Sequence, residues 1–221
     1  MLTLIAIILF LIIMVILFLI NFYKDPERKI PKGSNIVAPA DGRVISIIDM
    51  SANHKVISDH ARKSSIFDTS KKYITIKKGI LGKIKVWSKD IAKECLVVSI
   101  FMSPFDAHIN RAPIEGIVKS TKHTKGRFFK AYDLEKSFRN ENNQIVISNK
   151  KIKIKVIQIA GFLARRILCY TKSNQKVNKG QRIGMITLGS QATIIIPKGV
   201  NLKIKVNDRV KAGESVIANL K

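Results

Sequence analysis

The chain contains the stretch RIGMITLGSQATIIIP at residues 182–197, and this stretch predicts two β-strands separated by a Gly-Ser pair. Both halves are rich in β-prone residues, and the glycine permits backbone geometry that other residues rarely adopt. Such geometry lets the Ser190 hydroxyl reach back to the carbonyl group of Gly189, which favours cleavage of the chain there. A Gly-Ser pair alone is equally typical of a turn or a bulge, so its meaning depends on the rest of the sequence.

Alternation of apolar with basic or polar residues predicts strands in other parts of the chain. The pattern is clearest at residues 151–156 and 202–206, and it is shorter at residues 73–76 and 83–86. Only residues 126–138 indicate a helix, through aromatic and leucine pairs spaced four apart, and an ordered loop is the alternative there. We therefore expect a mainly β domain of the barrel-sandwich type, with short helical and loop elaborations.

Two pairs of short segments with a shared sequence pattern, which we call echoes, support this architecture. Residues 177–183 and 210–216 share the pattern V-x-x-G-x-x-[I/V], and residues 38–44 and 112–118 share A-P-x-[D/E]-G-x-V. Each pattern alone is ordinary turn chemistry, because Pro, Asp and Gly favour turns. Together they predict glycine turns that join short strands of a barrel-like sandwich.

The N-terminal residues predict a membrane anchor at residues 1–23. Thr3 is the only polar residue between positions 2 and 20, and this run is long enough to cross a hydrocarbon core of about 30 Å as a helix. No small-residue cleavage site follows it, so we expect the anchor to be retained. A linker at residues 24–33 then leads to a β-rich domain at residues 34–221.

The charge distribution predicts the orientation and the partner of the chain. Basic residues flank only the C-terminal end of the apolar run, which places the domain on the cytoplasmic side of the cell membrane; they are Lys24, Arg28, Lys29 and Lys32. The 221 residues carry a formal charge of +25, from 40 Lys and Arg against 15 Asp and Glu. Together with the anchor, this charge favours an anionic membrane as the partner. The sequence lacks the basic stripe interleaved with aromatic residues that would indicate nucleic-acid binding. A compositional bias toward lysine is the alternative explanation.

Cysteine and histidine spacing indicates no metal site and no disulfide framework. Cys95 and Cys169 lie far apart without a C-x-x-C pattern, and no H-E-x-x-H motif occurs. His54, His60 and His123 lie in polar, lysine-rich surroundings that predict solvated loops.

Four stretches occur together in a recognisable order and spacing. They are APADG at residues 38–42, FMSPFDAHINRAP at 101–113, QIAGFLARRI at 158–167 and GMITLGS at 184–190. In this combination the chain resembles the phosphatidylserine decarboxylase family, in its short, membrane-anchored branch. The resemblance runs from about residue 22 to residue 218, except for about 49–87, which we interpret as a local elaboration.

The resemblance implies a proenzyme that makes its own cofactor. In the family, the serine of the Gly-Ser pair attacks the preceding carbonyl, and the chain breaks to leave an N-terminal pyruvoyl group. The expected products are a β chain of residues 1–189 and an α chain of residues 190–221, held together as a heterodimer or within a higher oligomer. Asp41, His108 and Ser190 match the Asp-His-Ser triad of the family. Such a triad has a chemical purpose, because serine is a weak nucleophile and needs an adjacent base.

The resemblance also implies the reaction, conversion of phosphatidylserine to phosphatidylethanolamine and CO2. The pyruvoyl carbonyl at position 190 would form a Schiff base with the substrate amine and accept electrons when CO2 leaves. Arg165 and Arg166 either bind a lipid phosphate or carboxylate or are solvated charges. Arg111 stands where a longer branch has a second histidine, which leaves the proton donor to the α carbon open.

Two alternatives remain at this stage. A noncatalytic, membrane-anchored barrel-sandwich adaptor would have the same β pattern and anchor, although it has no need of Asp41, His108 and the Gly-Ser pair together. A membrane-tethered nucleic-acid binder would rest on charge alone. The sequence also leaves open whether the lipid substrate is a diacyl or an ether lipid.

Overall fold

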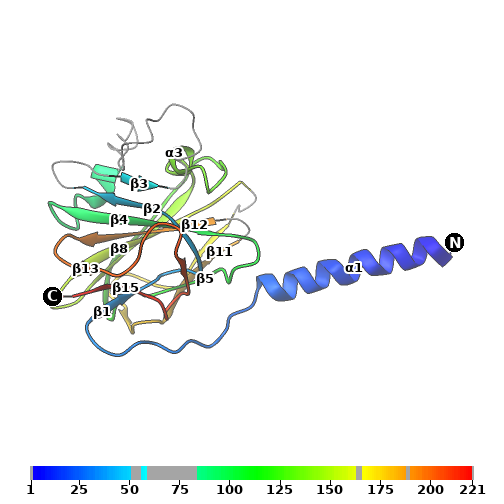
Figure 1. Cartoon of the computed structure of the whole chain (residues 1–221), viewed down its shortest axis with the longest axis horizontal. Helices are drawn as coiled ribbons and strands as arrows, with labels where there is room; N and C mark the ends of the chain where they lie inside the picture. The colour runs from blue at the N-terminus through cyan, green and yellow to red at the C-terminus, as the bar shows by residue number, and fades with distance from the viewer. Residues whose placement is uncertain (1, 51–55, 59–83, 163–165, 188–189, 221) are drawn as a thin grey trace.

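A long N-terminal helix projects from a β domain in the computed structural model (Figure 1). The structure describes residues 2–50, 56–58, 84–162, 166–187 and 190–220. The elements are α1 (Leu2–Phe22), β1 (Asn35–Val37), β2 (Gly42–Asp49), β3 (Val56–Ser58), β4 (Cys95–Met102), β5 (Ile109–Arg111), β6 (Gly116–Thr124), α3 (Leu134–Ser137), β7 (Asn142–Ser148), β8 (Lys153–Ile159), β9 (Ile167–Cys169), β10 (Lys176–Val177), β11 (Arg182–Ile186), β12 (Ser190–Pro197), β13 (Asn201–Leu202), β14 (Arg209–Val210) and β15 (Val216–Asn219).

The two strands predicted from residues 182–197 are present as β11 and β12. β12 lies inside a curled nine-stranded antiparallel sheet of order β10-β6-β7-β8-β12-β4-β2-β14, with β3 paired to β2. Ile194 and Ile195 point to opposite faces of the sheet and are both fully buried, one in each of two hydrophobic clusters. A strand buried on both faces has a continuous apolar sequence, which explains the Ile194-Ile195-Ile196 run. The prediction of a mainly β domain is confirmed.

The main sheet has an internal pseudo-twofold arrangement. The order β10-β6-β7-β8 from one end corresponds to β14-β2-β4-β12 from the other. The register between β2 and β4 shifts between Val44 and Ser46, and the register between β6 and β7 shifts at the equivalent place, between Val118 and Ser120. The pseudo-twofold axis therefore passes between β8 and β12.

The sequence echoes are the turns that this pseudo-symmetry relates. Gly213 donates its N–H to the carbonyl of Ala38, and Gly180 donates its N–H to the carbonyl of Ala112. Both glycines have positive φ angles, 77° and 79°, that favour glycine over other residues. The prediction of glycine turns between short strands is confirmed, and each turn packs against its partner Ala-Pro segment.

Two short predictions differ from the structure. Residues 84–88 are helical rather than extended, with Ile84 and Trp87 buried and Val86 exposed, because a four-residue pattern does not separate a period of 2 from one of 3.6. Within residues 202–206 only Leu202 is in a strand, since the partner β15 is short. Burial still alternates along that segment.

The remaining local predictions were partly right. Within residues 126–138 the only helix is the single turn α3, and the rest is the ordered loop given as the alternative. His123 lies on strand β6 rather than in a loop, although it is solvated and contacts Glu141 at 3.0 Å. Residues 73–76, His54 and His60 lie outside the described residues.

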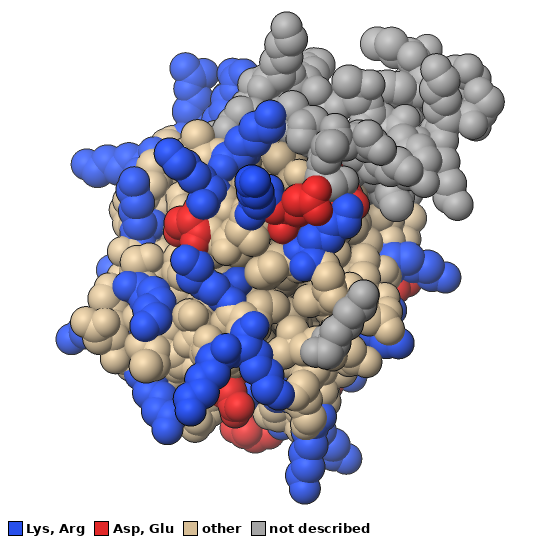
Figure 2. Space-filling view, turned by 90° about the vertical axis from the view of Figure 1, so that its left-hand side faces the viewer, with Lys and Arg blue, Asp and Glu red and all other residues tan. Residues whose placement is uncertain are grey.

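Basic side chains also cover the face of the domain that is turned away from α1. Figure 2 views this face, and Lys and Arg are spread over it with few acidic residues between them. Positive charge is therefore also present on the side of the domain away from the helix. Charge alone does not identify a membrane-binding face of this protein.

Candidate active site

Ser190 is the first residue of β12 and is fully buried. It pairs with Met102 across the sheet, and its Oγ donates to the Met102 Sδ at 3.3 Å. A thioether sulfur is a weak acceptor, so the hydroxyl hydrogen is not held by a strong hydrogen bond. Residues 188–189, which include the proposed scissile carbonyl group, lie outside the described residues.

A series of hydrogen-bonded, buried amide side chains ends near Ser190 and Met102. Asn143 donates to Gln158 at 2.8 Å, and Gln158 donates to the Oδ1 of Asn110 at 2.9 Å. This fixes the Asn110 amide so that its Nδ2 points to the Met102 Sδ at 3.7 Å and the Pro39 carbonyl at 3.5 Å. Both contacts are long, so among the residues that the structure describes Asn110 has no strong acceptor for this buried N–H donor near Ser190. Sequence analysis missed this role, although Asn110 lies within one of the family stretches.

His108 is buried, with one ring nitrogen bonded and one free. Its Nδ1 lies 2.8 Å from the backbone carbonyl of Asp106, which only accepts, so Nδ1 carries the hydrogen. The Nε2 atom is buried without a hydrogen-bond partner among the described residues. The Phe22 ring covers the imidazole, with the ring centroids 4.1 Å apart. His108 is therefore arranged as a neutral imidazole with an available lone pair on Nε2.

The burial of His108 predicts a loss of stability in acid. The pKa of His108 is lowered from 6.5 to about 4, chiefly because burial removes the imidazole from water. The hydrogen bond to the Asp106 carbonyl and the charges of Asp106 and Asp41 raise the pKa and offset part of this effect, whereas Lys24 adds to the lowering. Below pH 6.5 the unfolded chain binds a proton that the folded chain binds only near pH 4. The free energy of unfolding should therefore fall by about 3 kcal/mol from pH 6.5 to pH 4 through this residue.

Unfolding of the detergent-solubilised protein at pH 7 and at pH 4.5 measures this effect. His108→Gln is the comparison, because an amide does not titrate and the carboxylates are common to both proteins. The variant should lose less stability than the wild type over this range. Equal losses in the two proteins would contradict a buried neutral His108.

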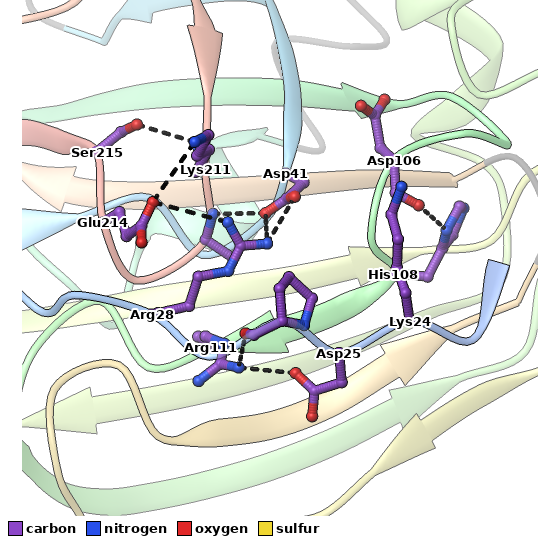
Figure 3. A network of polar contacts seen from close by, with 12 residues as sticks. Lys24, Asp25, Arg28, Asp41, Asp106, His108, Arg111, Lys211, Glu214 and Ser215 are labelled. Atoms are coloured by element: carbon purple, nitrogen blue, oxygen red, sulfur yellow. Dashed lines mark hydrogen bonds and ion pairs between the residues drawn. The ribbon is translucent and has the colours of Figure 1, made fainter. Parts of the chain in front are cut away.

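Asp41 is held by a cation and by a backbone group. Arg28 donates to both carboxylate oxygens at 2.9 and 2.8 Å, and the N–H of Ala212 donates to Oδ1 at 2.7 Å (Figure 3). No hydrogen bond or ion pair joins Asp41, His108 and Ser190 to one another among the described residues. The fold brings each of them to one end of the domain, but it places them in separate polar contacts.

Arg111 points toward the linker rather than into the predicted triad. Its guanidinium donates to Asp25 at 2.7 Å, to the Pro26 carbonyl and to the Gly180 carbonyl, both at 3.1 Å. The residue at the second-histidine position therefore has a structural role. Arg166 is exposed, and Arg165 lies outside the described residues. In the described part of the chain, no group of three or more His, Cys, Asp or Glu could hold a metal ion.

Comparison with known proteins places these residues in a family. The model of the family described as phosphatidylserine decarboxylase matches residues 15–218. The chain belongs to the phosphatidylserine decarboxylase family. A protein of Methanocaldococcus jannaschii, provisionally named an archaetidylserine decarboxylase proenzyme, is 41% identical over 207 residues, covering 92% of this chain and 90% of its own. The phosphatidylserine decarboxylase proenzyme of Chlorobaculum tepidum is 32% identical over 203 residues, covering 91% and 77%.

The phosphatidylserine decarboxylase match includes more than the four stretches recognised in the sequence. It begins inside α1, so it covers Phe22 and Arg28 together with Asp41, His108 and Ser190. The family resemblance is confirmed, and the chain is a decarboxylase of this family. The residues that contact His108 and Asp41 from the juxtamembrane side are part of the same matched region.

Proposed function

We propose that this protein is a self-cleaving, pyruvoyl-dependent decarboxylase proenzyme that acts on the phosphoserine headgroup of a membrane lipid. The observation that carries the proposal is the buried hydroxyl of Ser190, the first residue of the central strand β12, which has only a thioether as its partner among the described residues. A buried hydroxyl normally has a strong hydrogen bond, whereas the Ser190 hydroxyl has only a weak one to a sulfur. Because this weak contact is easily given up, the hydroxyl can turn toward the preceding peptide group.

Self-cleavage follows from the chemistry of this serine. Attack of the Ser190 Oγ on the Gly189 carbonyl carbon converts the peptide to an ester as the C–N bond breaks. Removal of the α hydrogen of residue 190 then expels the Gly189 carboxylate and leaves a dehydroalanine. Its hydrolysis by water releases ammonia and leaves a pyruvoyl group at the new N-terminus. Asp41 and His108 are the proposed proton-handling groups, because serine needs a base at neutral pH.

The two fragments would remain together after cleavage. The fragment of residues 190–221 contains β12, which is hydrogen-bonded to β4 on one side and to β8 on the other. It also contains β15, which pairs with β1. Since these contacts do not depend on the bond before Ser190, we propose a heterodimer of the two chains.

The surroundings of Ser190 suit a carbonyl group at that position. Asn110 offers a buried N–H donor that has no strong acceptor in the described part of the chain, and His108, at the same end of the domain, offers an unprotonated Nε2. A pyruvoyl group supplies an electron-withdrawing carbonyl that condenses with the substrate amine. We assign Asn110 to orient the polar groups at the reacting centre and His108 to exchange a proton at the substrate α carbon.

The proposed substrate carries serine as its headgroup on a diacyl or an ether lipid. The relatives above are named for phosphatidylserine and for archaetidylserine, which share this headgroup. Both lipids present the amine and the carboxylate on which the reaction depends. The hydrocarbon tails of the lipid take no part in the reaction.

We propose that α1 anchors the domain in the cell membrane, with the domain on the cytoplasmic side. The segment Thr3–Phe22 has a mean hydropathy of 3.5, and apart from Phe22 at its end its side chains are not buried, so it needs an apolar environment. At its end, Tyr23 is 59% exposed, and Lys24 donates to the carbonyl of Phe105, which is itself 71% exposed. Exposed aromatics beside a spanning helix are typical of the membrane interface.

The intact mass of the purified protein under denaturing conditions tests this function. We expect two polypeptides that correspond to residues 1–189 and 190–221, the smaller one blocked to N-terminal sequencing by its pyruvoyl group. A single uncleaved chain from folded protein would contradict the proposal and favour the noncatalytic adaptor. Release of CO2 from vesicles of phosphatidylserine and of its ether analogue then identifies the lipid.

A further inference from the structure

We infer that the juxtamembrane segment of residues 22–30 is a component of the active site, with Arg28 as the residue that positions Asp41. The inference rests on the proposed function, because it assigns a role in the same self-cleavage step. By its place in the sequence, Arg28 is only one of the basic residues that flank the anchor. In the structure its side chain is 6% exposed, which is unusual for an orientation signal at a membrane surface.

The segment is attached to the domain along its length. Near its beginning, Asp25 pairs with Arg111 and with Arg182, and Arg182 also pairs with Glu27 at 3.0 Å. Near its end, the N–H of Lys29 donates to Glu214 at 3.0 Å. Several of these residues are shown in Figure 3. A segment with so many polar contacts does not behave as a free linker.

The last residue of the segment packs where the two pseudo-symmetric turns meet. A Cβ placed on Gly180 would lie 2.2 Å from the Ile30 side chain, and one placed on Gly213 would lie 3.1 Å from it. A larger residue at either turn would therefore press on the Ile30 side chain. The apolar contact fixes the position of the chain just after Arg28.

Arg28 holds Asp41 with defined geometry. Its Nη2 donates to both carboxylate oxygens, and its Nη1 lies 3.8 Å from Glu214. Asp41 therefore has a cation on one side and the N–H of Ala212 on the other. Removing one partner of a buried ion pair is costly, because it leaves the other charge without compensation. Without Arg28, the carboxylate would lose the contact that sets its orientation.

The same segment covers the second proposed catalytic residue. Phe22 is buried at the end of α1 and lies against the imidazole of His108, while Arg28 contacts Asp41. Through the hydrogen bond from Lys29 to Glu214, the segment also contacts the C-terminal fragment that self-cleavage would form. One short segment thus links the membrane anchor, two proposed catalytic residues and both fragments. The anchor therefore places the active site next to the membrane surface.

The test is the rate of self-cleavage of the full-length chain synthesised into lipid vesicles. We expect Arg28→Gln to slow appearance of the 190–221 fragment at least about tenfold, because Asp41 loses its charged partner. Arg28→Lys should recover most of the rate, to within about threefold of the wild type, because it restores the charge beside Asp41 without the second nitrogen that lies near Glu214. Melting temperatures of the variants report on folding.

Arg182→Gln is the matched control. It removes contacts of Asp25 and Glu27 with the domain but leaves the Arg28–Asp41 pair, so its rate should stay within about twofold of the wild type, as expected for a largely exposed ion pair. Cleavage of Arg28→Gln at the wild-type rate would overturn the inference. An equal slowing by Arg182→Gln, or no recovery with lysine, would also overturn it, since either would indicate a general loss of attachment. Failure of the wild type itself to cleave would instead contradict the proposed function.

Discussion

Replacement of Ser190 by alanine should leave a single polypeptide of full length without decarboxylase activity. The side chain supplies the only atom that attacks the Gly189 carbonyl in the proposed reaction, so its loss should abolish fragment formation rather than slow it. The fold should survive, because the Ser190 Oγ contributes one weak hydrogen bond to a sulfur. Denaturing mass measurement of the membrane fraction scores the fragments, and CO2 release from phosphatidylserine scores activity.

Ser99→Ala is the control for loss of a buried hydroxyl from the same part of the sheet. The Ser99 Oγ lies 3.1 Å from Thr193 on β12, so its removal should cost about 1 kcal/mol of stability without preventing cleavage. Ser190→Cys should cleave slowly, because a thiol can make the same acyl shift. Normal cleavage and activity of Ser190→Ala would remove Ser190 from the mechanism.

The central part of this fold could be predicted because its signals are local. The apolar run at Ile194 to Ile196 and the Gly-Ser pair lie within a few residues of each other, and they predict strand β12 and its first residue. The turn echoes also use local chemistry, since each glycine has a positive φ angle within its own turn. The pseudo-twofold relation between the turns required the structure, because it depends on strand pairing across the whole sheet.

The surroundings of the predicted site residues could not be predicted because they come from distant parts of the chain. Phe22 lies in the apolar anchor, and nothing in that pattern indicates a contact with His108. Arg28 belongs to a basic cluster, and composition does not distinguish a buried ion pair from a solvated charge. Sequence motifs thus predict residues of the candidate site. The side chains that contact and orient these residues are determined by tertiary packing and are visible only in the structure.

Asp41→Asn should accumulate the uncleaved precursor. The amide has a similar shape, but it neither accepts a proton readily nor pairs with the Arg28 guanidinium as a carboxylate does. We expect fragment formation to slow about 100-fold or more, the range found for loss of a general base. Time courses of fragment formation in vesicles measure this rate.

Glu115→Gln is the matched control for Asp41→Asn. Glu115 occupies the pseudo-symmetric position in the second A-P-x-[D/E]-G-x-V turn, where it is exposed. It should therefore tolerate the change to an amide without effect on cleavage. Cleavage of Asp41→Asn at the normal rate, or equal slowing by Glu115→Gln, would show that Asp41 has no specific role in maturation.

His108→Ala separates maturation from turnover at the same site. Self-cleavage needs a base near the Ser190 hydroxyl, whereas turnover needs a group that exchanges a proton at the substrate α carbon. The free Nε2 of His108 suits the second task, since it is buried, neutral and without a partner among the described residues. We expect His108→Ala to release CO2 about 100-fold more slowly per cleaved fragment, whether or not fragment formation also slows. His123→Ala, which removes a solvated histidine, should change neither rate. If His108→Ala matures and turns over normally, then the imidazole is a packing partner of Phe22, and the proton at the α carbon must come from another group.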